Sequence, residues 1–464
     1  MGAPQQERPD SSTEKFWLYP KRIVFLGKFL DMTEHLKLLS SYNPWNGNAV
    51  PCGYRRDFYL SKIKAFSGNS LVKVLTGQRR AGKSYILRQV MMDLISDGVA
   101  DNNLLYISKE YTSFDFIRSY TDLDALIREY REHLKPEGKT YVFIDEIQNV
   151  EGWEKVVNSL SQDFTTPCEV FISGSNSKML SGELATLLSG RYVECEILPL
   201  SYEEWIGANM KDAGMRSYEE YLHESGLPEM LHLSAQEIRR HYVSSLKDTV
   251  LLRDIVERHK IRDVNTLEDL FVYLVNNATR LFTPNTIVKY YKSKGKTVNY
   301  ETVAAYLAYL TDTYLVHRTE RYNVQGKETI AGNCKYYIND LAFHNYLYRG
   351  FAYGYGYELE NLVYLDLRRA GYDVYVGNVP DSAEDRMLEV DFVGVQGENR
   401  IYVQVSYKMD NPETLKREYD SLEQVKDNYP KYVVTMDEFK LPSKDGITHV
   451  QAWDFHKELA KISR

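Results

Sequence analysis

The sequence predicts an α/β protein with a parallel-sheet domain, a helical middle region and a second mixed α/β domain. Between residues 71 and 174, short apolar runs typical of strands alternate with stretches of helical spacing. From 201 to about 320 the pattern is helical, and from 336 a helical stretch precedes four further apolar runs. Because 464 residues exceed one ordinary core, we expect several domains.

Composition and charge limit the classes of function. The hydrophobic content of 43% and the 38 tyrosines are typical of a folded globular chain. A net charge of -8 argues against nucleic-acid binding through overall charge, so any DNA-binding face is local. The four cysteines form no CxxC pair, which indicates neither a zinc ribbon nor a disulfide framework. No apolar run reaches the roughly 18 residues that span a bilayer, and we expect a cytoplasmic protein without membrane contact.

The first domain is expected to be a parallel sheet covered by helices on both faces. Strands of this type need helical crossovers, which the intervening spacing supplies. The predicted strands are 71–76, 103–108, 141–145 and 168–174, and the predicted helices are 83–98 and 114–134.

Residues 77–84 read GQRRAGKS and fit the pattern G-x-x-x-x-G-K-[ST] between a predicted strand and a predicted helix. In such a loop the backbone N–H groups wrap phosphates, and the helix N-terminus adds positive charge. Lys83 would reach the β and γ oxygens of ATP, and the Ser84 hydroxyl would bind Mg²⁺. Gly77 and Gly82 suit the backbone angles of the loop. The alternative, a basic turn, is weaker because the context also fits, so the motif predicts Mg-ATP binding.

A second polar group follows the apolar run YVFID. Asp145 and Glu146 end this predicted strand, at the edge where open α/β sheets bind ligands. We expect Asp145 to hold the Mg²⁺ shell and Glu146 to orient or deprotonate the attacking water. A strand ending in Asp-Glu is usually only a strand meeting solvent, but together with the phosphate loop it is a strong indication.

Further candidates follow the next predicted strand. Ser173, Ser175 and Asn176 are placed to sense the γ-phosphate, although a Ser/Asn turn is the commoner explanation. Arg191 is a candidate for neutralising transition-state charge, in its own subunit or a neighbouring one, and a surface arginine is the equal alternative. The full predicted nucleotide-binding set is Gly77, Gln78, Arg79, Arg80, Ala81, Gly82, Lys83, Ser84, Tyr85, Asp145, Ser175 and Asn176, with Lys83, Glu146 and Arg191 as catalytic residues.

These motifs, in order, resemble a known family. LTGQRRAGKS, FIDEIQNVEGW, ISGSNSKML, LSGRYVECEILPLSYEEW and ESGLPEM look like the bacterial and archaeal AAA-type P-loop ATPases that carry a C-terminal domain of unknown function. The resemblance covers nearly all the chain from about residue 54. It implies an ATPase core, a helical lid, a winged helix and a terminal nuclease-like fold, and it names no substrate.

The middle region predicts three helices and a wing. Thr283 and Pro284 indicate a helix start, Gly295 a tight turn, and residues 300–314 a third helix. That third helix is poor in the side chains that read base edges. The local basic cluster, Lys289, Lys292, Lys294 and Lys296, suits contact with a phosphate backbone, and a solvated lysine-rich turn is the alternative.

The last region looks like a restriction-endonuclease core with an altered site. Glu360 lies on a predicted helix, Asp391 on a predicted strand, and Gln404 stands where that pattern has a glutamate. Loss of this carboxylate weakens a Mg²⁺ site, because hard cations prefer charged oxygen ligands. Lys408 shares a face with Gln404, about 7 Å beyond the usual lysine position. We therefore expect an inactive or weak nuclease-like domain.

The leading hypothesis is a Mg-dependent ATPase whose nucleotide state reaches the later domains. The alternatives are a DNA-binding or DNA-processing module in which ATP is a switch, and a nucleotide-dependent scaffold without turnover. A homo-oligomer or a protein partner is considered with each of them. The predicted boundaries are an N-terminal extension (1–50), the P-loop domain (51–200), a helical lid (201–260), a winged helix (261–335) and the nuclease-like domain (336–464).

Overall fold

The computed structural model describes residues 33–462 except 181–187, 189, 349–353 and 382–383. The chain forms two compact units. The first comprises residues up to Gly77 together with Gly82–Ile197, and the second comprises Gln78–Ala81 together with Leu198–Arg464. Most of the expected N-terminal extension lies outside the described residues. Within the described part, no helix is both long and apolar enough to cross a bilayer.

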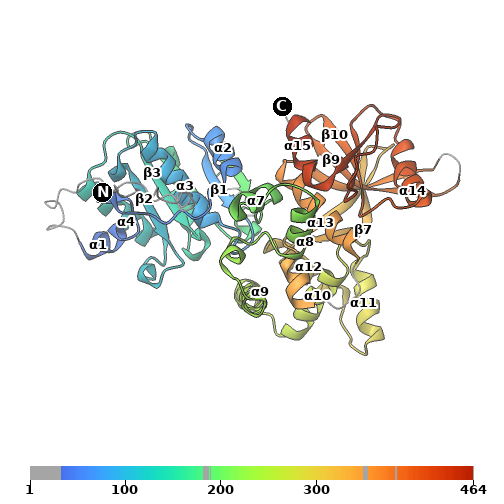
Figure 1. Ribbon diagram of the computed structural model, residues 1–464. Helices are drawn as coiled ribbons and strands as arrows, with labels where there is room; N and C mark the ends of the chain where they lie inside the picture. The colour runs from blue at the N-terminus through green and yellow to red at the C-terminus, as the bar shows by residue number, and fades with distance from the viewer. Residues whose placement is uncertain (1–32, 181–187, 189, 349–353, 382–383, 463–464) are drawn as a thin grey trace, which may run out of the picture. The chain divides into compact units, whose positions relative to one another are not determined.

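The first unit is built on a five-stranded sheet whose paired neighbours all run parallel, in the order β2-β3-β4-β1-β5. Figure 1 labels β1, β2 and β3 of this sheet. Burial along the whole length of β1, β2 and β4 matches the prediction of a sheet covered on both faces. The strands are β1 (Val72–Thr76), β2 (Leu104–Ser108), β3 (Thr140–Asp145), β4 (Cys168–Ser173) and β5 (Tyr192–Glu196). The helices are α1 (Glu34–Ser40), α2 (Asp57–Phe66), α3 (Lys83–Ser96), α4 (Tyr120–Leu134) and α5 (Trp153–Gln162).

The sheet topology positions the predicted site. Helix α3 packs on β3 and β4, and α5 packs on β4. Strand β4 lies between β1 and β3, with Leu75 opposite Ser173 and Ile144 opposite Ile172. Since parallel strands end at one edge, the segments that follow β1, β3 and β4 come together there.

Helix α4 begins later than the sequence predicts. The expected helix covers 114–134, whereas α4 begins at Tyr120. Ser119 and Asp122 form a capping box, in which the Asp122 carboxylate accepts from the Ser119 N–H at 2.9 Å. This cap satisfies the first backbone donors of the helix, so the preceding aromatic residues lie in a separate short turn.

The second unit begins with helices. A Ser201–Glu204 capping box starts the first of them. The predicted start at Thr283 and Pro284 is confirmed, because the Thr283 hydroxyl caps α11, and Gly295 adopts the positive φ of 76° expected for a tight turn. The helices are α7 (Tyr202–Asn209), α8 (Met215–His223), α9 (Gln236–Thr249), the π-helical segment η8 (Val250–Glu257), α10 (Val264–Asn276), α11 (Pro284–Ser293) and α12 (Tyr300–Asp312).

A mixed seven-stranded sheet follows, in the order β12-β11-β10-β9-β8-β6-β7. Its β8-β9-β10 core is antiparallel, and β11 and β12 extend it in parallel. The strands are β6 (Val316–Asn323), β7 (Glu328–Ile338), β8 (Asp373–Pro380), β9 (Met387–Gln396), β10 (Asn399–Ser406), β11 (Lys431–Thr435) and β12 (Ile447–Gln451). Helices α13 (Tyr355–Arg369), α14 (Pro412–Glu423) and α15 (Phe455–Ile462) accompany it.

The β6-β7 hairpin differs from the sequence interpretation. The sequence predicts helix up to about residue 320 and places the hairpin in the middle region as a wing. In the structure, β6 pairs in parallel with β8, with Arg321 opposite Val376, so the hairpin is part of the C-terminal sheet. The first half of β7 is largely exposed and polar, which explains why its sequence lacks an apolar strand signal.

Candidate functional site

The loop after β1 has the backbone geometry that the glycine pattern predicts. Gly77 has φ 133° and Gly82 has φ 102°. A Cβ on Gly77 would lie 2.3 Å from the Ile197 carbonyl oxygen, so only glycine fits there. Gly82 precedes α3 and provides no side-chain cap, so the first N–H groups of this 14-residue helix have no hydrogen bond from a capping side chain. A helix start of this kind is a common position for binding an anion.

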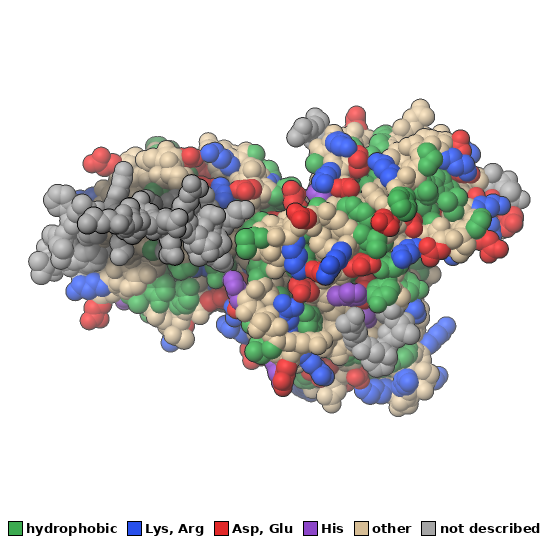
Figure 2. Space-filling model, in the orientation of Figure 1, with side chains coloured by type: hydrophobic (Ala, Val, Ile, Leu, Met, Phe, Trp, Pro, Cys, Tyr) green, Lys and Arg blue, Asp and Glu red, His purple; other side chains and the backbone are tan. Residues whose placement is uncertain are grey.

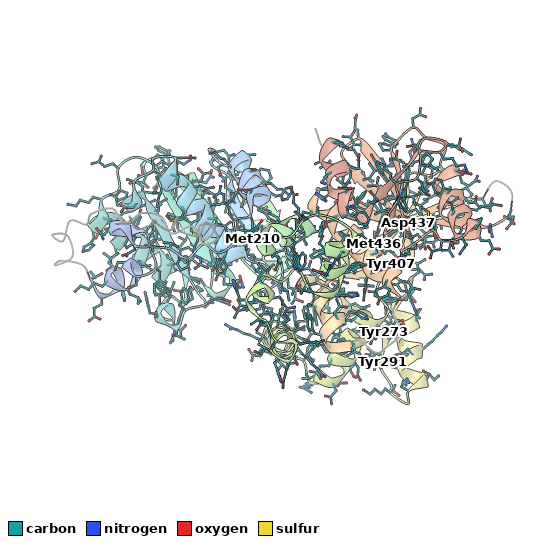
Figure 3. The ribbon with its side chains drawn as sticks, viewed as in Figure 1. Met210, Tyr273, Tyr291, Tyr407, Met436 and Asp437 are labelled. Carbon is teal, nitrogen blue, oxygen red and sulfur yellow. The ribbon has the colours of Figure 1, made fainter. Side chains whose placement is uncertain are left out.

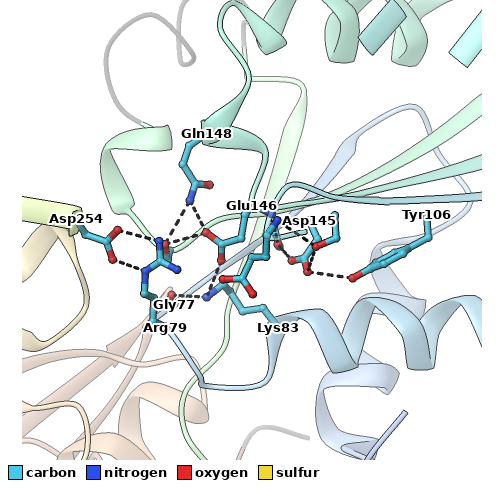
Figure 4. A network of polar contacts seen from close by, with 12 residues as sticks. Gly77, Arg79, Lys83, Tyr106, Asp145, Glu146, Gln148 and Asp254 are labelled. Carbon is cyan, nitrogen blue, oxygen red and sulfur yellow. Dashed lines mark hydrogen bonds and ion pairs between the residues drawn. The ribbon is translucent and has the colours of Figure 1, made fainter. Parts of the chain in front are cut away.

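Lys83 is held at the centre of this loop. Its side chain is 4% exposed. The Nζ donates to the Gly77 carbonyl at 2.9 Å and lies 3.7 Å from Glu146 Oε1 (Figure 4). Contacts within the protein therefore position the ammonium between the loop backbone and the carboxylate of Glu146.

Asp145 is buried at the end of β3, where the sequence places it. Its Oδ2 accepts from the Tyr106 hydroxyl at 3.0 Å, and its Oδ1 accepts from the Ser173 hydroxyl. Burial and the neighbouring Asp145 charge raise the pKa of Tyr106 well above its usual value, so this phenol stays a donor. Two neighbouring strands, β2 and β4, thus fix the orientation of the Asp145 carboxylate.

Glu146 follows in a left-handed conformation, with φ 53°. Its N–H donates to Ser173 Oγ at 3.1 Å, and its Oε2 accepts from Ser175 Oγ at 3.0 Å and from the Gln148 side-chain amide. A non-glycine residue with positive φ is uncommon, and here the strand-end contacts hold it. The carboxylate that the sequence predicts to act on water is therefore rigidly placed beside Lys83.

The remaining predicted loop residues have different surroundings. Ser84, in the first turn of α3, is partly exposed, Ala81 and Asn176 are buried, and Arg80 is exposed with φ 66°. Tyr85 is 41% exposed, and the Arg88 guanidinium lies 4.3 Å from its ring centre. Tyr85 therefore lies at the surface of the first turn of the helix.

Gln78 and Arg79 belong to the second unit and are buried in it. The Arg79 guanidinium donates from Nε to Asp254 Oδ2 and from Nη2 to Asp254 Oδ1, and the Nη2–Oδ1 distance is 2.9 Å. The Gln78 Oε1 accepts from Asn339 Nδ2 at 2.8 Å. These side chains, predicted to bind nucleotide, are thus engaged by η8 and by the residue after β7.

The structure places Arg191 away from the other predicted site residues. Strand β5 runs parallel to β1, with Tyr192 opposite Val72 and Glu196 opposite Thr76. Arg191 therefore lies at the edge where β1 begins, and the phosphate loop follows the other end, about 13 Å away at 3.3 Å per residue. Its carbonyl accepts from the Val72 N–H at 3.0 Å, and its side chain is exposed. Arg191 therefore lies at the opposite edge of the sheet from the loop 77–84 of its own chain.

Comparisons with known proteins identify the family of this chain. Residues 69–206 match a family model described as an AAA domain, and residues 215–352 match one described as a domain of unknown function. An uncharacterized protein of Haemophilus influenzae is 33% identical over 86% of this chain and 98% of its own length. The chain belongs to the family of AAA-type P-loop ATPases with a C-terminal domain of unknown function.

Two further similarities are weaker. An uncharacterized protein of Methanocaldococcus jannaschii is 31% identical over 73% of this chain and 75% of its own length. The Walker-type ATPase paby2304 of Pyrococcus abyssi aligns with 62% of this chain and 94% of that chain, at 14% identity and a TM-score of 0.41. A similarity at this score supports no inference about function.

The C-terminal region of this AAA-family chain brings together part of its predicted site. Glu360 on α13 and Asp391 on β9 are both buried and share the partner Lys335. Gln404 on β10 accepts from the Asp391 N–H at 3.2 Å, and its amide donates to Glu418 on α14 at 2.9 Å. The expected common face does not extend to Lys408, because β10 ends at Ser406 and Lys408 is exposed.

Several side chains that contact the predicted site residues are not singled out by the sequence. Tyr106, Gln148, Asp254 and Lys335 each contact a predicted site residue. Tyr106 and Lys335 are polar groups within apolar strand sequences, which is a usable signal, since a buried polar group needs a partner. Asp254 lies in a helical stretch far along the chain and carries no such signal.

Proposed function

We propose that the AAA domain binds Mg-ATP at the loop 77–84 and hydrolyses it. The observation that carries this proposal is the buried pair of Lys83 and Glu146, 3.7 Å apart at the end of β3. The fit to a triphosphate is supported by the left-handed glycines and by the uncapped start of α3. Ser84 and Asp145 supply a hydroxyl and a carboxylate, the oxygen ligands that Mg²⁺ prefers.

Each side chain has a distinct task in this mechanism. The loop N–H groups and Lys83 bind the phosphates and offset the charge that develops on the γ-phosphoryl oxygens. Glu146, fixed by Ser175 and Gln148, orients a water for in-line attack and accepts its proton. Ser84 and Asp145 would hold Mg²⁺, which would supply further neutralisation of the phosphate charge. Hydrogen bonds from Tyr106 and Ser173 orient the Asp145 carboxylate, which would help to hold the metal ion.

Replacing Lys83 with Ala is expected to weaken ATP binding by roughly 10- to 100-fold, because the variant loses a charge-assisted hydrogen bond to phosphate. Isothermal titration calorimetry with ATP and Mg²⁺ measures the change. Lys64→Ala is the matched control, since Lys64 is an exposed residue of α2 that pairs with Asp97 at 2.9 Å. An unchanged affinity in Lys83→Ala would show that the loop does not hold the phosphates.

We also propose that the nucleotide state of the AAA domain is transmitted to the later domains of the chain. We propose that residues 201–260 form a helical lid and that α10, α11 and α12 form the three helices of a winged-helix domain. We propose that Arg191 acts, if at all in catalysis, on the ATP site of a neighbouring subunit. This role requires a homo-oligomer. A scaffold that binds ATP without turnover is the outcome expected if Glu146 does not act on water.

A second candidate function is contact with a nucleic-acid backbone at α11. Lys289, Lys292, Lys294 and Lys296 are all exposed on this helix and the turn after it, and Figure 2 shows basic side chains gathered over α11 on the visible face. Lys296 pairs with Asp269, and Lys294 lies 5.9 Å from the Tyr290 ring centre.

Helices α10 and α11 and the segments that follow them line a cavity of about 550 Å³, and its lining includes Tyr273, Tyr291 and Arg280. Figure 3 marks the two tyrosines in the region of α10, α11 and α12. The buried residues of α12, among them Tyr306, Leu307 and Leu310, pack inward. This arrangement favours phosphate contact without base recognition.

The double variant Lys289→Ala/Lys292→Ala is expected to weaken duplex DNA binding uniformly across sequences. It is also expected to reduce the slope of log affinity against log salt by about 1.8, or 0.9 for each phosphate that is no longer neutralised. Fluorescence anisotropy at several salt concentrations measures both quantities. Lys416→Ala/Lys440→Ala removes the same charge from exposed positions elsewhere. An equal effect in both double variants would contradict a site on α11.

A further inference from the structure

Lys335 is a buried lysine on the edge strand of the seven-stranded sheet. It lies in β7, where the strand passes from exposed to buried residues, and its side chain is only 4% exposed. Its neighbours along the chain, Cys334, Tyr336 and Tyr337, are also buried. A lysine is almost never fully buried unless it is paired, so its surroundings need an explanation.

Three carboxylates from two other elements converge on the Lys335 ammonium. Its Nζ lies 2.9 Å from Glu360 Oε1 on α13, 2.8 Å from Glu389 Oε1 on β9, and 3.9 Å from Asp391 Oδ1 on the same strand. Glu389 and Asp391 alternate on one face of β9, which explains how both reach the same point. Lys335 and these three acids are called the lysine cluster below.

Other groups of the protein also engage the cluster. The Tyr337 hydroxyl donates to Glu360 Oε1 at 2.9 Å, and the Val405 N–H donates to Asp391 Oδ2 at 2.8 Å. Gln404, which replaces the expected glutamate, is bonded to the Asp391 N–H, to Ser421 and to Glu418. Its side chain thus links β9 to α14 and is no substitute for the missing carboxylate.

The charges favour an ammonium ion at this position. Burial alone would lower the pKa of Lys335, but the charges of Glu360, Asp391 and Glu389 outweigh it and raise the pKa above its usual value. Burial and the charge of Glu360 raise the pKa of Asp391. The ammonium of Lys335 thus lies where three carboxylates meet, and the chain itself provides the positive charge at this point.

A divalent metal does not fit beside this lysine. Mg²⁺ needs oxygen ligands at about 2.1 Å in octahedral geometry, and the ammonium already lies among the oxygens that would supply them. Within the described ranges, no group of three or more acidic, histidine or cysteine side chains is arranged to hold a metal ion. We propose that the ammonium of Lys335 takes the place of the divalent cation in the nuclease-like domain and closes its carboxylates to metals.

This proposal predicts that removing the lysine charge opens a metal site. Lys335→Met keeps an unbranched apolar stem, removes the terminal ammonium and leaves three carboxylates facing one another. Without divalent metal the variant is expected to have a lower Tm than wild type, because like charges repel. With Mn²⁺ its Tm is expected to recover, and electron paramagnetic resonance is expected to show bound Mn²⁺ that wild type lacks.

The controls separate this cluster from the phosphate loop, which also handles metal. All measurements use the full chain without nucleotide. Adding Asp391→Asn to Lys335→Met is expected to abolish the gain of Mn²⁺, whereas Lys327→Met, at an exposed turn residue, is expected to behave as wild type. A folded Lys335→Met chain that gains no Mn²⁺ would overturn the proposal.

Wild type provides a second, independent test if Lys335→Met fails to fold. Mn²⁺ is titrated into wild type and into Asp391→Asn alone. Equal binding in the two proteins is expected, because the lysine excludes metal from the cluster in both. Stoichiometric Mn²⁺ in wild type that disappears in Asp391→Asn would show that the metal displaces Lys335, and the proposal would be wrong.

Discussion

Replacing Glu146 with Gln is expected to slow phosphate release from ATP by about 10²- to 10⁴-fold while ATP affinity stays close to that of wild type. The amide keeps the size of the side chain and its hydrogen bonding to Ser175, but it no longer accepts a proton from water. Because Glu146 belongs to the buried network around Lys83, the substitution changes chemistry more than shape. Single-turnover phosphate release and calorimetric ATP binding measure the two effects separately.

Glu151→Gln is the matched control, since Glu151 lies in the same connection after β3 and is exposed. It is expected to hydrolyse ATP as wild type does. If Glu146→Gln turned over at the wild-type rate, the carboxylate would not be the group that handles the water. If it lost ATP binding as well, Glu146 would serve the loop as a structural partner of Lys83.

Glu169→Leu is expected to lower the free energy of unfolding of the first unit by about 3–5 kcal/mol, the usual cost of leaving one partner of a buried ion pair alone. Lys73 on β1 and Glu169 on β4 are 1% and 2% exposed, with Nζ and Oε1 2.6 Å apart. Glu169 also accepts from Lys139 and from the Gly68 N–H. Urea titration followed by circular dichroism measures the loss.

The double variant Lys73→Leu/Glu169→Leu is expected to regain much of that stability, because it leaves no uncompensated charge between β1 and β4. Asp124→Ala, which removes the exposed Arg128–Asp124 pair on α4, is expected to change stability by at most about 1 kcal/mol. A loss as small in Glu169→Leu would show that the buried pair does not support the sheet.

The same carboxyl group predicts a dependence on pH. Burial opposes ionisation of Glu169, but hydrogen bonds from Lys139 and Lys73 outweigh it and lower its pKa below the usual value. Its contribution is therefore complete above the unfolded pKa of about 4.3 and is lost as the pH falls through the lower, folded value. The double leucine variant is expected to lose this part of the acid sensitivity.

Much of the first unit can be predicted from the sequence because its strands are buried on both faces. The runs at 71–76, 103–108, 141–145 and 168–174 match β1 to β4 to within one residue at each end. In the second unit, β7 is not predicted in full because its first half is polar and exposed, and its pairing through β6 to β8 joins distant segments. Periodicity reports burial, and it does not report which strand lies next to which.

Some residues of the candidate site can be predicted from the sequence, and others are identified only from the structure. Lys83, Asp145 and Glu146 are predicted from short local motifs, because each motif contains the neighbours that give it its chemistry. The structure brings Lys83 and Glu146 together and buries Asp145 beside them. Arg191 is assigned from the sequence by its position in a motif, and only the register of β5 against β1 shows that it lies at the opposite edge. Lys335 meets Glu360 and Asp391 through packing of β7 against α13 and β9, which no local pattern encodes.

The central claim, that the loop 77–84 supports ATP hydrolysis, is tested most directly by steady-state phosphate release from ATP by the full chain. The assay is run with Mg²⁺, with excess chelator, and with Lys83→Ala as the blank. The proposed mechanism predicts repeated turnovers that require Mg²⁺ and are lost in Lys83→Ala. A wild-type chain that binds ATP with Mg²⁺ but releases no phosphate would contradict it and would favour a nucleotide-dependent scaffold.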